Sequence, residues 1–532
     1  MFISTKLNGV LILWGNRLLK IFMHVISNDS SIYNDMLSGF RHVFFSVIVL
    51  IFFSCRPSHL FNITDFGARG DSIKINTAAI QRAIDMASFS GGGIVVIPKG
   101  IFITGTIEMK SNVTLQLLHG AVLYGSSDGR EYKTFRHSVK LYPDTMRRYL
   151  VYARNASNIA ITGDGTINGN GTSFWEPFDT LPRWIKPLKG RVSNMIEFVG
   201  CNNIRITDVL FTNSPEWTVH LYNCEKVFIS RIRLINNLYG PNNDGIDLSG
   251  CKDVMISDSY IETCDDAICL KTFPESAETE NICVTNCVMK TTCVAFKMGE
   301  TYRDIRFVTF SNSVIKESSR AIGIYGNFGG TLENINISNI VCNTNAPLVL
   351  NRPVQISVWN DGRGFPPGRV RNVTISNLTA VTQGRIMLTA IPGYPLENIT
   401  LRDIRIVYPY IEDPSVFGVN ATSNQFAAMD MKQRLAPSAC VASNINNLLI
   451  SNLQVVWPDD TIPAIWKHPV RIENGSDRVH KPVYRVPRET GFSVFWGRRI
   501  NNGKVEIVNT VPSDPKMSLT VVKESNLKIV AN

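Results

Sequence analysis

One short motif recurs along this chain: a polar residue, most often Asn, is followed by two apolar residues that are separated by one position. The segment Asn203-Ile204-Arg205-Ile206 is a clear copy. From Ile204 to Ile335 the first apolar residue of the motif advances by 23, 27, 28, 23 and 30 residues. Such steps, filled with short alternating segments and Gly, Asn or Asp turns, are typical of the coils of a parallel β-helix. Copies begin at Asn112, Asn158, Asn203, Lys226, Asp253, Asn281, Asp304, Asn334, Asn372, Asn398 and Asn447.

The repeat predicts an all-β protein, a single-stranded right-handed parallel β-helix in which each coil stacks on the previous one. No low-complexity linker interrupts residues 60–510, so we expect one long domain there and a C-terminal tail over residues 511–532. The open end of such a solenoid needs a cap. A short N-terminal capping helix is predicted after Asn76-Thr77, because apolar residues then recur at helical spacing, at Ala79, Ile80, Ala83, Ile84 and Ala87.

The cysteines fit the same repeat. Cys201, Cys224 and Cys251 each lie three residues before an apolar residue of the motif, so they should stack as a ladder inside the solenoid. A metal site or disulfides would be the alternative. Eleven cysteines in 532 residues are too few for a disulfide scaffold, and a free cysteine behaves as a small buried hydrophobe. We therefore interpret the three as core residues.

The N-terminal segment, residues 1–55, carries a targeting signal. Residues 43–53 form an apolar run that is too short to span a bilayer and is typical of a signal peptide. The run ends next to Cys55 in a pattern that resembles a bacterial lipoprotein signal, so Cys55 is a candidate for lipidation. We expect the true start of the protein at Met36, so that residues 1–35 would not belong to it. We expect an exported protein, lipid-anchored in a bacterial envelope or else secreted.

The net charge of +10 is spread along the chain and fits an acidic partner, which could be nucleic acid, an anionic membrane or an acidic polysaccharide. Export argues against nucleic acid. We therefore expect a polysaccharide partner, a membrane contact only through the predicted lipid anchor, and a monomer.

A second alignment concerns six-residue strands that start at Trp217, Asp244, Asp266, Val294 and Arg320 and superpose without gaps. Their third and fifth residues are almost all apolar and should point inward, because side chains alternate along a strand. The fourth and sixth residues should then form two columns on a solvent-facing sheet. These columns are His220, Asp247, Cys269, Lys297 and Gly323, and Tyr222, Ser249, Lys271, Gly299 and Tyr325.

The same alignment brings three carboxylates together. Asp244 and Asp266 are equivalent positions on successive coils, whose strands lie about 4.8 Å apart, and Asp265 is adjacent to Asp266. Like charges this close raise at least one pKa, which suits acid/base chemistry on a long ligand. A solvated face with turn-forming Asp is the structural alternative. The predicted binding residues around the acids are Asn242, Asp247, Lys297, Arg320, His220, Trp217, Lys271 and Tyr325, and we expect no metal and no cofactor.

Five segments carry a resemblance to a known family: Asp65–Asp71, Ile161–Gly169, Asn242–Asp247, Cys264–Ile268 and Ile391–Ile399. They resemble the family 28 glycoside hydrolases, the polygalacturonase and rhamnogalacturonase group. The most specific match is Asn-x-Asp-Gly-Ile followed by Asp-Asp. The resemblance implies that Asp265 is the general acid, that Asp244 and Asp266 activate the attacking water, and that the reaction inverts the anomeric configuration.

Two motifs of that family are absent. Val294 stands where the family has the His of Gly-His-Gly, and Ala321-Ile322-Gly323 stands where it has Arg-Ile-Lys. Arg320 lies one residue before the position of the family's Arg. Lys297 occupies the position equivalent to the family's Lys, but one coil earlier. We therefore expect an acidic plant cell-wall polysaccharide, or its oligosaccharides, as substrate, with rhamnogalacturonan-type or chain-end cleavage in place of plain endo-cleavage of homogalacturonan.

Two alternatives stay open at this point. A polysaccharide lyase on the same fold would use an Arg or Lys base, usually with Ca²⁺, and Lys271, Lys297 and Arg320 are candidates for that base. A non-catalytic glycan-binding solenoid would bind without releasing reducing ends.

Overall fold

The computed structural model describes residues 59–136, 139, 146–177, 185–346, 351–360, 362–382, 384–409, 438–456, 470–473, 483–486, 493–508, 510 and 518–531. The chain divides into two compact units, residues 1–59 and 60–532. The predicted signal segment, with Met36 and Cys55, lies outside the described residues. No helix among the described residues is long and apolar enough to cross a membrane.

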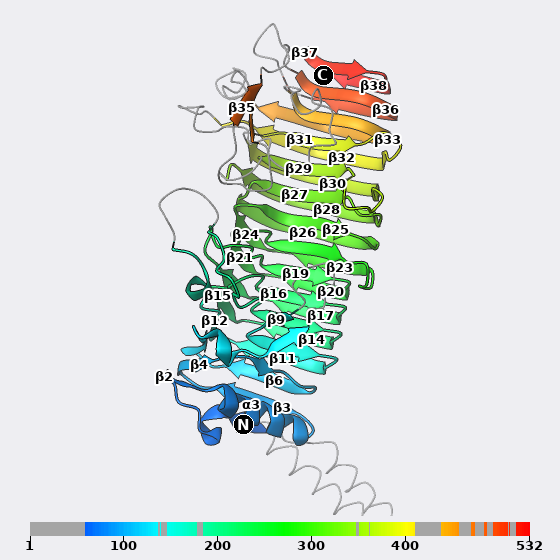
Figure 1. Ribbon diagram of the computed structural model, residues 1–532. Coiled ribbons are helices and arrows are strands. Elements are labelled where there is room, and N and C mark those ends of the chain that lie inside the picture. Colours follow the sequence, from blue (N-terminus) through cyan, green and yellow to red (C-terminus); the bar gives the residue numbers. More distant parts are fainter. Residues whose placement is uncertain are drawn as a thin grey trace, which may run out of the picture. The chain divides into compact units, whose positions relative to one another are not determined.

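The second unit is a right-handed parallel β-helix, as predicted (Figure 1). Each coil contributes strands that pair in parallel with the equivalent strands of the next coil. One stack of strands carries the candidate site, and we call its members the site strands. They are β5 (Ile107–Glu108), β10 (Val151–Arg154), β13 (Ile196–Val199), β16 (Val219–Tyr222), β19 (Ile246–Ser249), β22 (Ile268–Thr272), β25 (Val294–Thr301), β27 (Arg320–Gly326), β29 (Arg352–Val358) and β31 (Ile386–Ala390).

Two further stacks complete the first coils. The second stack consists of β1 (Leu60–Asn62), β3 (Gly93–Ile97), β6 (Val113–Leu117), β11 (Ser157–Gly163), β14 (Asn202–Thr207), β17 (Glu225–Ser230), β20 (Lys252–Ser257) and β23 (Thr279–Thr285). The third stack consists of β2 (Asp71–Ile75), β4 (Gly100–Thr104), β7 (Ala121–Gly125), β12 (Thr166–Asn168), β15 (Leu210–Thr212), β18 (Arg233–Ile235), β21 (Tyr260–Thr263) and β24 (Val288–Thr291).

The second and third stacks merge from β26 onward, because β26 pairs with both β23 and β24. The long strands that follow continue the coils as far as β38. They are β26 (Ile305–Glu317), β28 (Thr331–Thr344), β30 (Arg369–Thr382), β32 (Leu396–Val407), β33 (Ser438–Val456), β36 (Ser493–Ile507), β37 (Ser518–Lys523) and β38 (Asn526–Ala531). Strands β37 and β38 pair with β36 beyond residue 510, so this part of the expected tail adds strands to the solenoid.

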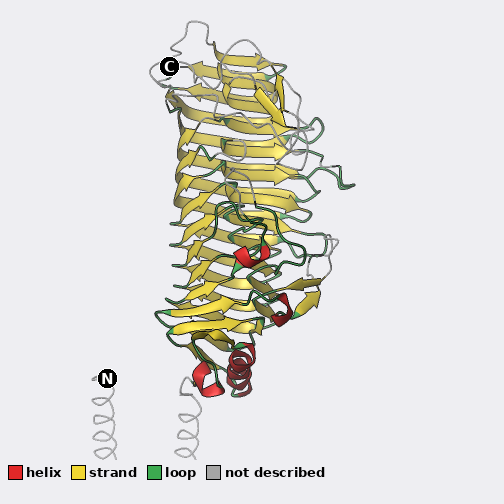
Figure 2. Cartoon of the chain, turned by 60° about the vertical axis from the view of Figure 1, so that its left-hand side comes forward, coloured by secondary structure: helices red, strands yellow, loops and turns green. Residues whose placement is uncertain are grey.

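The remaining elements are short. Figure 2 shows the helices in red, with α3 at the N-terminal end of the coils. Two antiparallel pairs lie outside the solenoid stacks. These elements are η1 (Ile63–Phe66), α3 (Thr77–Phe89), η2 (Gly129–Glu131), η3 (Gly171–Phe174), β8 (Thr134–Arg136) with β9 (Met146–Arg148), and β34 (Val470–Glu473) with β35 (Val483–Val486).

The polar residue of the repeat adopts a left-handed backbone conformation at a turn between strands. Asn203 and its equivalents have φ between 50° and 65°, a region that Asn tolerates better than most residues. Their side chains also join coil to coil: Asn158 Nδ2 donates to Asn112 Oδ1 at 2.8 Å, and Asn203 Nδ2 donates to Asn158 Oδ1 at 2.7 Å. The motif found in the sequence is therefore a corner of the solenoid, held by amide hydrogen bonds.

One copy of the motif was misplaced by three residues. The spacing in the sequence predicts a start at Asp304, but in the structure Val308 lies opposite Ile282 and Ile335. The true steps at this point are 26 and 27 residues. Phe307, with φ 56°, occupies the left-handed corner where most other coils have Asn, and this hid the motif.

The predicted cap and cysteine ladder are confirmed. Helix α3 buries the five apolar residues predicted for it, Ala79, Ile80, Ala83, Ile84 and Ala87. Asn76 does not cap the helix through its side chain; instead its Nδ2 donates to the carbonyl oxygens of Arg69 and Lys74. Cys201, Cys224 and Cys251 are buried in the core, and none of the three forms a disulfide.

Phe307 provides a test of the corner. Phe307→Asn should stabilise the protein by about 1 kcal/mol, because a left-handed conformation costs an ordinary residue roughly 1–2 kcal/mol. The Phe307 side chain is 53% exposed, so little packing is lost, and the new amide can join those of the neighbouring coils. The urea midpoint should rise. Phe307→Leu is the matched control, because it also removes the ring, and an equal midpoint for both variants would contradict the corner argument.

Candidate functional site

The predicted superposition of the site strands is confirmed by their register. Ile246 lies opposite Ile268, and Ile268 lies opposite Phe296. The residue two positions before each of these inward residues forms a column that we call the entry column. In it Asp244 and Asp266 are neighbours, since Gly245 N donates to Asp266 O at 2.9 Å. The entry column runs through Tyr149, Asn194, Trp217, Asp244, Asp266, Val294 and Arg320.

Two expectations about these strands are wrong. Strand β25 holds one extra residue relative to β22, because Leu270 faces Met298 whereas Thr272 faces Thr301. This bulge breaks the predicted match between Lys271 and Gly299. The outward residues are also not solvent-facing: His220, Asp247, Cys269, Ser249, Lys271, Tyr222 and Tyr325 are all buried.

Asp244 lies among charges in the interior of the site. Lys271 Nζ is 3.4 Å from Asp244 Oδ2 and 2.7 Å from Asp247 Oδ1, and it also lies 3.7 Å from the centre of a ring of Trp217. Burial and the charges of Asp247 and Asp265 raise the pKa of the Asp244 carboxyl well above its usual range, against the opposing effect of Lys271. Asp244 Oδ1 has no hydrogen-bond partner among the described residues.

Asp266 is in the opposite electrostatic situation. Burial acts to raise its pKa, but Lys297, whose Nζ lies 2.6 Å from Asp266 Oδ2, together with Lys271 and Arg320 lowers the pKa below its usual value. Asp266 Oδ1 has no hydrogen-bond partner in the described part of the chain. The site therefore contains an ionised aspartate next to one whose pKa is raised, which is the pattern expected of acid/base chemistry.

Asp265 is the half-exposed member of the three. Its Oδ1 accepts a hydrogen bond of 3.0 Å from the backbone N–H of Asp266. Together with Asp266 and Cys293 it offers three possible ligand atoms within 4.8 Å of one another. Two of these residues already contact cationic side chains, because Asp266 pairs with Lys297 and Cys293 Sγ accepts from Arg320 Nη2 at 3.4 Å. This donor set does not suit a divalent cation.

Lys297 and Arg320, predicted to bind a substrate carboxylate, have protein partners in the structure. Lys297 pairs with Asp266, and Arg320 Nη1 donates to Tyr325 Oη at 3.1 Å. Arg320 and Tyr325 are both buried. Lys297 therefore holds a catalytic candidate in its charged form, and substrate binding by either cation stays a prediction.

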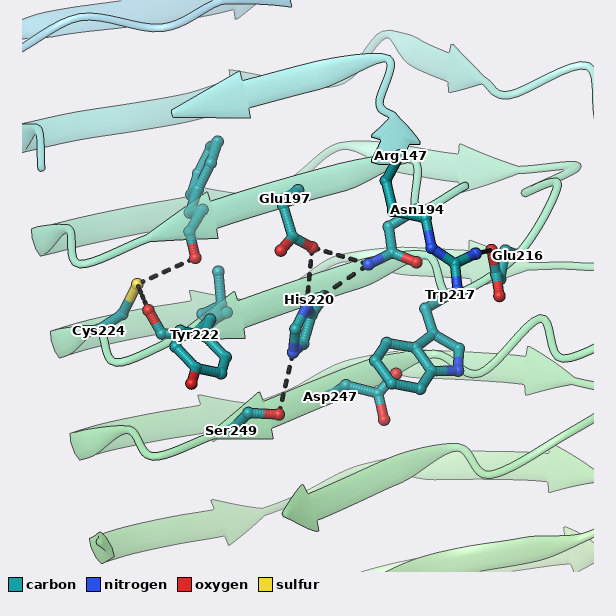
Figure 3. Close-up of polar contacts among 12 residues, drawn as sticks. Arg147, Asn194, Glu197, Glu216, Trp217, His220, Tyr222, Cys224, Asp247 and Ser249 are labelled. Atoms are coloured by element: carbon teal, nitrogen blue, oxygen red, sulfur yellow. Dashed lines mark hydrogen bonds and ion pairs between the residues drawn. The ribbon is translucent and has the colours of Figure 1, made fainter. Parts of the chain in front are cut away.

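A buried hydrogen-bonded chain links the neighbouring site strands β13, β16 and β19 (Figure 3). His220 Nδ1 is 2.7 Å from Glu197 Oε2, His220 Nε2 is 2.9 Å from Ser249 Oγ, and Asn194 Nδ2 donates to Glu197 at 2.7 Å. The residue types are those of a serine nucleophile triad, but Glu197, His220 and Ser249 are fully buried. The chain joins side chains of β13, β16 and β19, and the His220 ring meets the Trp217 ring edge-on at 5.0 Å.

Four residues of this region were missed in the sequence. Asn194 and Glu197 would have been found by extending the six-residue alignment one coil upstream, since Asn194-Met-Ile-Glu197-Phe-Val199 fits it. Asn243 fixes two acid-bearing turns, because its Oδ1 accepts from Cys264 N at 2.7 Å and its Nδ2 donates to Asn237 O. Arg147 comes from the β8–β9 hairpin, and no periodic signal marks it.

A cavity of about 230 Å³ opens beside these residues. Its lining includes three entry-column residues upstream of Asp244, namely Tyr149, Asn194 and Trp217. Asn242, a predicted binding residue, is exposed and contributes to the lining. The cavity is lined by Arg147, Tyr149, Ser193, Asn194, Glu216, Trp217 and Asn242.

Comparison with known proteins agrees with this geometry. The model of one family, described as glycosyl hydrolases family 28, matches residues 94–427, which is more than half of the chain and includes the three acids. A protein named probable polygalacturonase from Vitis vinifera is 32% identical over 231 residues, 41% of this chain and 45% of that protein. The exo-poly-alpha-D-galacturonosidase of Dickeya chrysanthemi is 28% identical over 39% of this chain and 41% of its own. The chain thus spans less than half the length of these two curated relatives.

A solved structure is similar as well. The hyperthermoactive exopolygalacturonase from Thermotoga maritima superposes with a TM-score of 0.57 at 25% sequence identity. The superposition covers 66% of this chain and 88% of that protein.

The Lys297–Asp266 pair predicts a change of stability with pH. In Lys297→Met, burial is no longer opposed by its nearest cation, so the pKa of Asp266 should rise above its usual value. The folded variant would then hold the proton of Asp266 more tightly than the unfolded chain does. Protonation therefore stabilises the fold at low pH, and this contribution is lost as pH rises. The variant should therefore lose about 3–5 kcal/mol at pH 7 and recover part of it at pH 5.

Urea unfolding at the two pH values measures this effect. Lys290→Met is the control, because Lys290 pairs with Glu317 at 3.0 Å near the surface and should contribute under about 1 kcal/mol. Equal losses in both variants, independent of pH, would show that Lys297 does not hold Asp266 ionised.

Proposed function

This chain belongs to family 28 of the glycosyl hydrolases, and we propose that it hydrolyses galacturonate-containing pectic polysaccharide from a chain end. The observation that carries the proposal is the set of three acids at the strand entry. One is ionised by Lys297, one has a raised pKa, and one is half-exposed at the opening of the site.

We assign roles to the acids from their surroundings and from the family resemblance. Asp265 donates its proton to the glycosidic oxygen, and the bond from that oxygen to the anomeric carbon breaks. A water held between the unpartnered oxygens of Asp244 and Asp266 attacks the same carbon. Ionised Asp266 takes up the proton of that water. This single displacement inverts the configuration, with general acid and general base on different carboxyl groups.

Burial of the outward columns supports action at a chain end. A polysaccharide that ran through the site would need an exposed groove across many coils. Upstream, Glu197 and His220 are covered, and downstream, Gln355 and Met387 are covered as well. Two of the similar proteins are named as exo-acting enzymes. The site is thus better suited to receive an end of the polymer than its middle.

Two further points of the proposal come from the sequence alone. The absence of the Gly-His-Gly and Arg-Ile-Lys motifs keeps rhamnogalacturonan as a candidate polymer beside homogalacturonan. Export rests on residues 36–55, which lie outside the described residues, so it stays a prediction.

The three acids are tested by replacement. Asp244→Asn, Asp265→Asn and Asp266→Asn keep the side-chain volume and remove the proton chemistry. Each should lower kcat on oligogalacturonides by about 10²–10⁴-fold, the usual contribution of a general acid or base. Asp253→Asn is the control, because Asp253 lies on a corner of the solenoid, where it accepts a hydrogen bond from Asn281. Near wild-type turnover in all three folded variants would remove them from the mechanism.

The products test both the direction of cleavage and the stereochemistry. Proton NMR of early samples should show one small product released from the chain end, with the anomeric configuration opposite to that of the cleaved bond. The assay should compare homogalacturonan with rhamnogalacturonan. Random internal fragments would contradict chain-end action, retained configuration would contradict single displacement, and unsaturated sugar ends would indicate a lyase.

A further inference from the structure

Asp247 is a buried carboxylate to which the proposed reaction gives no role. It lies on β19, three residues after Asp244, and its side chain is 0% exposed. Lys271 Nζ lies 2.7 Å from Asp247 Oδ1. A buried ion pair adds little net stability, because removal of two charges from water offsets their attraction. The value of this pair is therefore expected to lie in the acids beside it.

Lys271 is shared among three groups. Its Nζ lies 3.4 Å from Asp244 Oδ2, 2.7 Å from Asp247 Oδ1 and 3.7 Å from the centre of a ring of Trp217. A charge-assisted hydrogen bond is about 2.7–2.9 Å long, so the contact with Asp247 has a normal length and the contact with Asp244 is stretched. Asp247 therefore draws the ammonium away from Asp244.

Asp266 provides the contrast. Lys297 Nζ lies 2.6 Å from Asp266 Oδ2, and among the described carboxylates it forms an ion pair with Asp266 alone. Burial acts to raise the pKa of Asp266, but Lys297 lowers it below its usual value. Burial and the charge of Asp247 keep the pKa of Asp244 raised, although Lys271 opposes them. Asp247 thus makes the two contacts between lysine and catalytic aspartate unequal.

The surroundings of the pair are crowded with charges (Figure 3). Asp247 lies between His220 and Cys269 in the column of outward residues. Burial raises the pKa of Asp247, and Lys271 and His220 oppose that effect. Lys271 is the cation that contacts both Asp244 and Asp247. The charged and titratable groups around the pair are Glu197 on β13, His220 on β16, Cys269 and Lys271 on β22, Lys297 on β25, and Asp265 and Asp266 ahead of β22.

We propose that Asp247 is a positioning residue of the reaction, which holds the Lys271 ammonium over the Trp217 ring and away from Asp244. Asp244 Oδ1, which has no hydrogen-bond partner among the described residues, then stays open to the attacking water. Without Asp247 the ammonium would close on Asp244 and compete with that water. The inference rests on the proposed function for the reaction, and it adds a residue that acts on the reaction through Lys271.

Asp247→Asn keeps the side-chain volume and removes the charge that holds Lys271. On oligogalacturonides kcat should fall about 10–100-fold, a part of what a general acid or base contributes, while KM stays within about 3-fold of the wild type. Glu333→Gln is the matched control, because Glu333 also pairs with one cation, Arg371 at 2.6 Å, on β28 outside the site strands. Unchanged kcat in folded Asp247→Asn, or a loss confined to KM, would overturn the proposal.

Removal of the displaced cation should reverse the defect. Asp247→Asn/Lys271→Met replaces both charges of the pair, so it leaves neither of them buried alone and should fold at least as well as Asp247→Asn. It should recover at least about 3-fold of the lost kcat. A double variant no more active than Asp247→Asn would show that the defect does not act through Lys271. If Asp247→Asn does not fold, the double variant is compared with the wild type, and a loss of kcat beyond about 10-fold would overturn the proposal.

The pH profile of kcat/KM, which reports groups of the free enzyme, gives a test of sign. Asp247→Asn removes a charge that raises the pKa of Asp244, so the limb that belongs to Asp244 should move to lower pH. Lys271→Met removes the opposing cation, so the same limb should move to higher pH. A loss of packing does not produce shifts of opposite sign. Shifts in the same direction, or no shift, would contradict the role of the pair.

A crystal structure of Asp247→Asn separates this inference from the proposed function. If the inference holds, Lys271 Nζ lies about 2.7–2.9 Å from an oxygen of Asp244, the length of a charge-assisted hydrogen bond. This movement, together with a wild type that releases no sugar, would refute the proposed reaction and keep the positioning by Asp247. Hydrolysis by the wild type, with Lys271 unmoved in the variant, would refute the positioning and keep the reaction.

Discussion

Parallel stacking of coils at one fixed spacing is the constraint on which this structure depends. Because every coil must turn at the same place, residues such as Asn203 adopt a left-handed conformation there, and their amides bond from coil to coil. The register that results places equivalent side chains in straight columns. Inward columns build an apolar core of Ile, Val and Leu. The entry column, by the same rule, brings Asp244 and Asp266 together although 21 residues separate them in the chain.

Such columns concentrate like charges, and the structure compensates them in a consistent way. Each acid-bearing coil is followed by a strand that carries a lysine: Lys271 reaches back to Asp244 and Asp247, and Lys297 reaches back to Asp266. The cations have unequal effects, because Asp244 keeps a raised pKa and Asp266 has a lowered one. A difference in the local balance of charges thus shifts the pKa values of two identical side chains in opposite directions.

The sequence predicted what periodicity controls. The coils, the cap, the cysteine ladder and the neighbourhood of the three acids all follow from residue spacing. Where a single residue departed from the pattern, prediction failed: Phe307 at a corner shifted one motif by three residues, and the extra residue of β25 displaced the expected partner of Lys271. Burial of the outward columns was missed for another reason. Tyr222, for example, packs with Val139, which lies outside the repeated strands, and no repeat encodes that contact.

The ladder of Cys201, Cys224 and Cys251 affects how the protein becomes irreversibly inactivated. Burial raises the pKa of the Cys224 thiol, and only a thiolate attacks disulfides, so this thiol is protected from exchange while the coils are folded. Opening of the coils would expose several thiols at once, at positions where new pairings can form. Unfolded molecules would then be trapped by incorrect disulfides before they could refold. In an oxidising compartment the working lifetime of this solenoid is therefore set by the rate at which its coils separate.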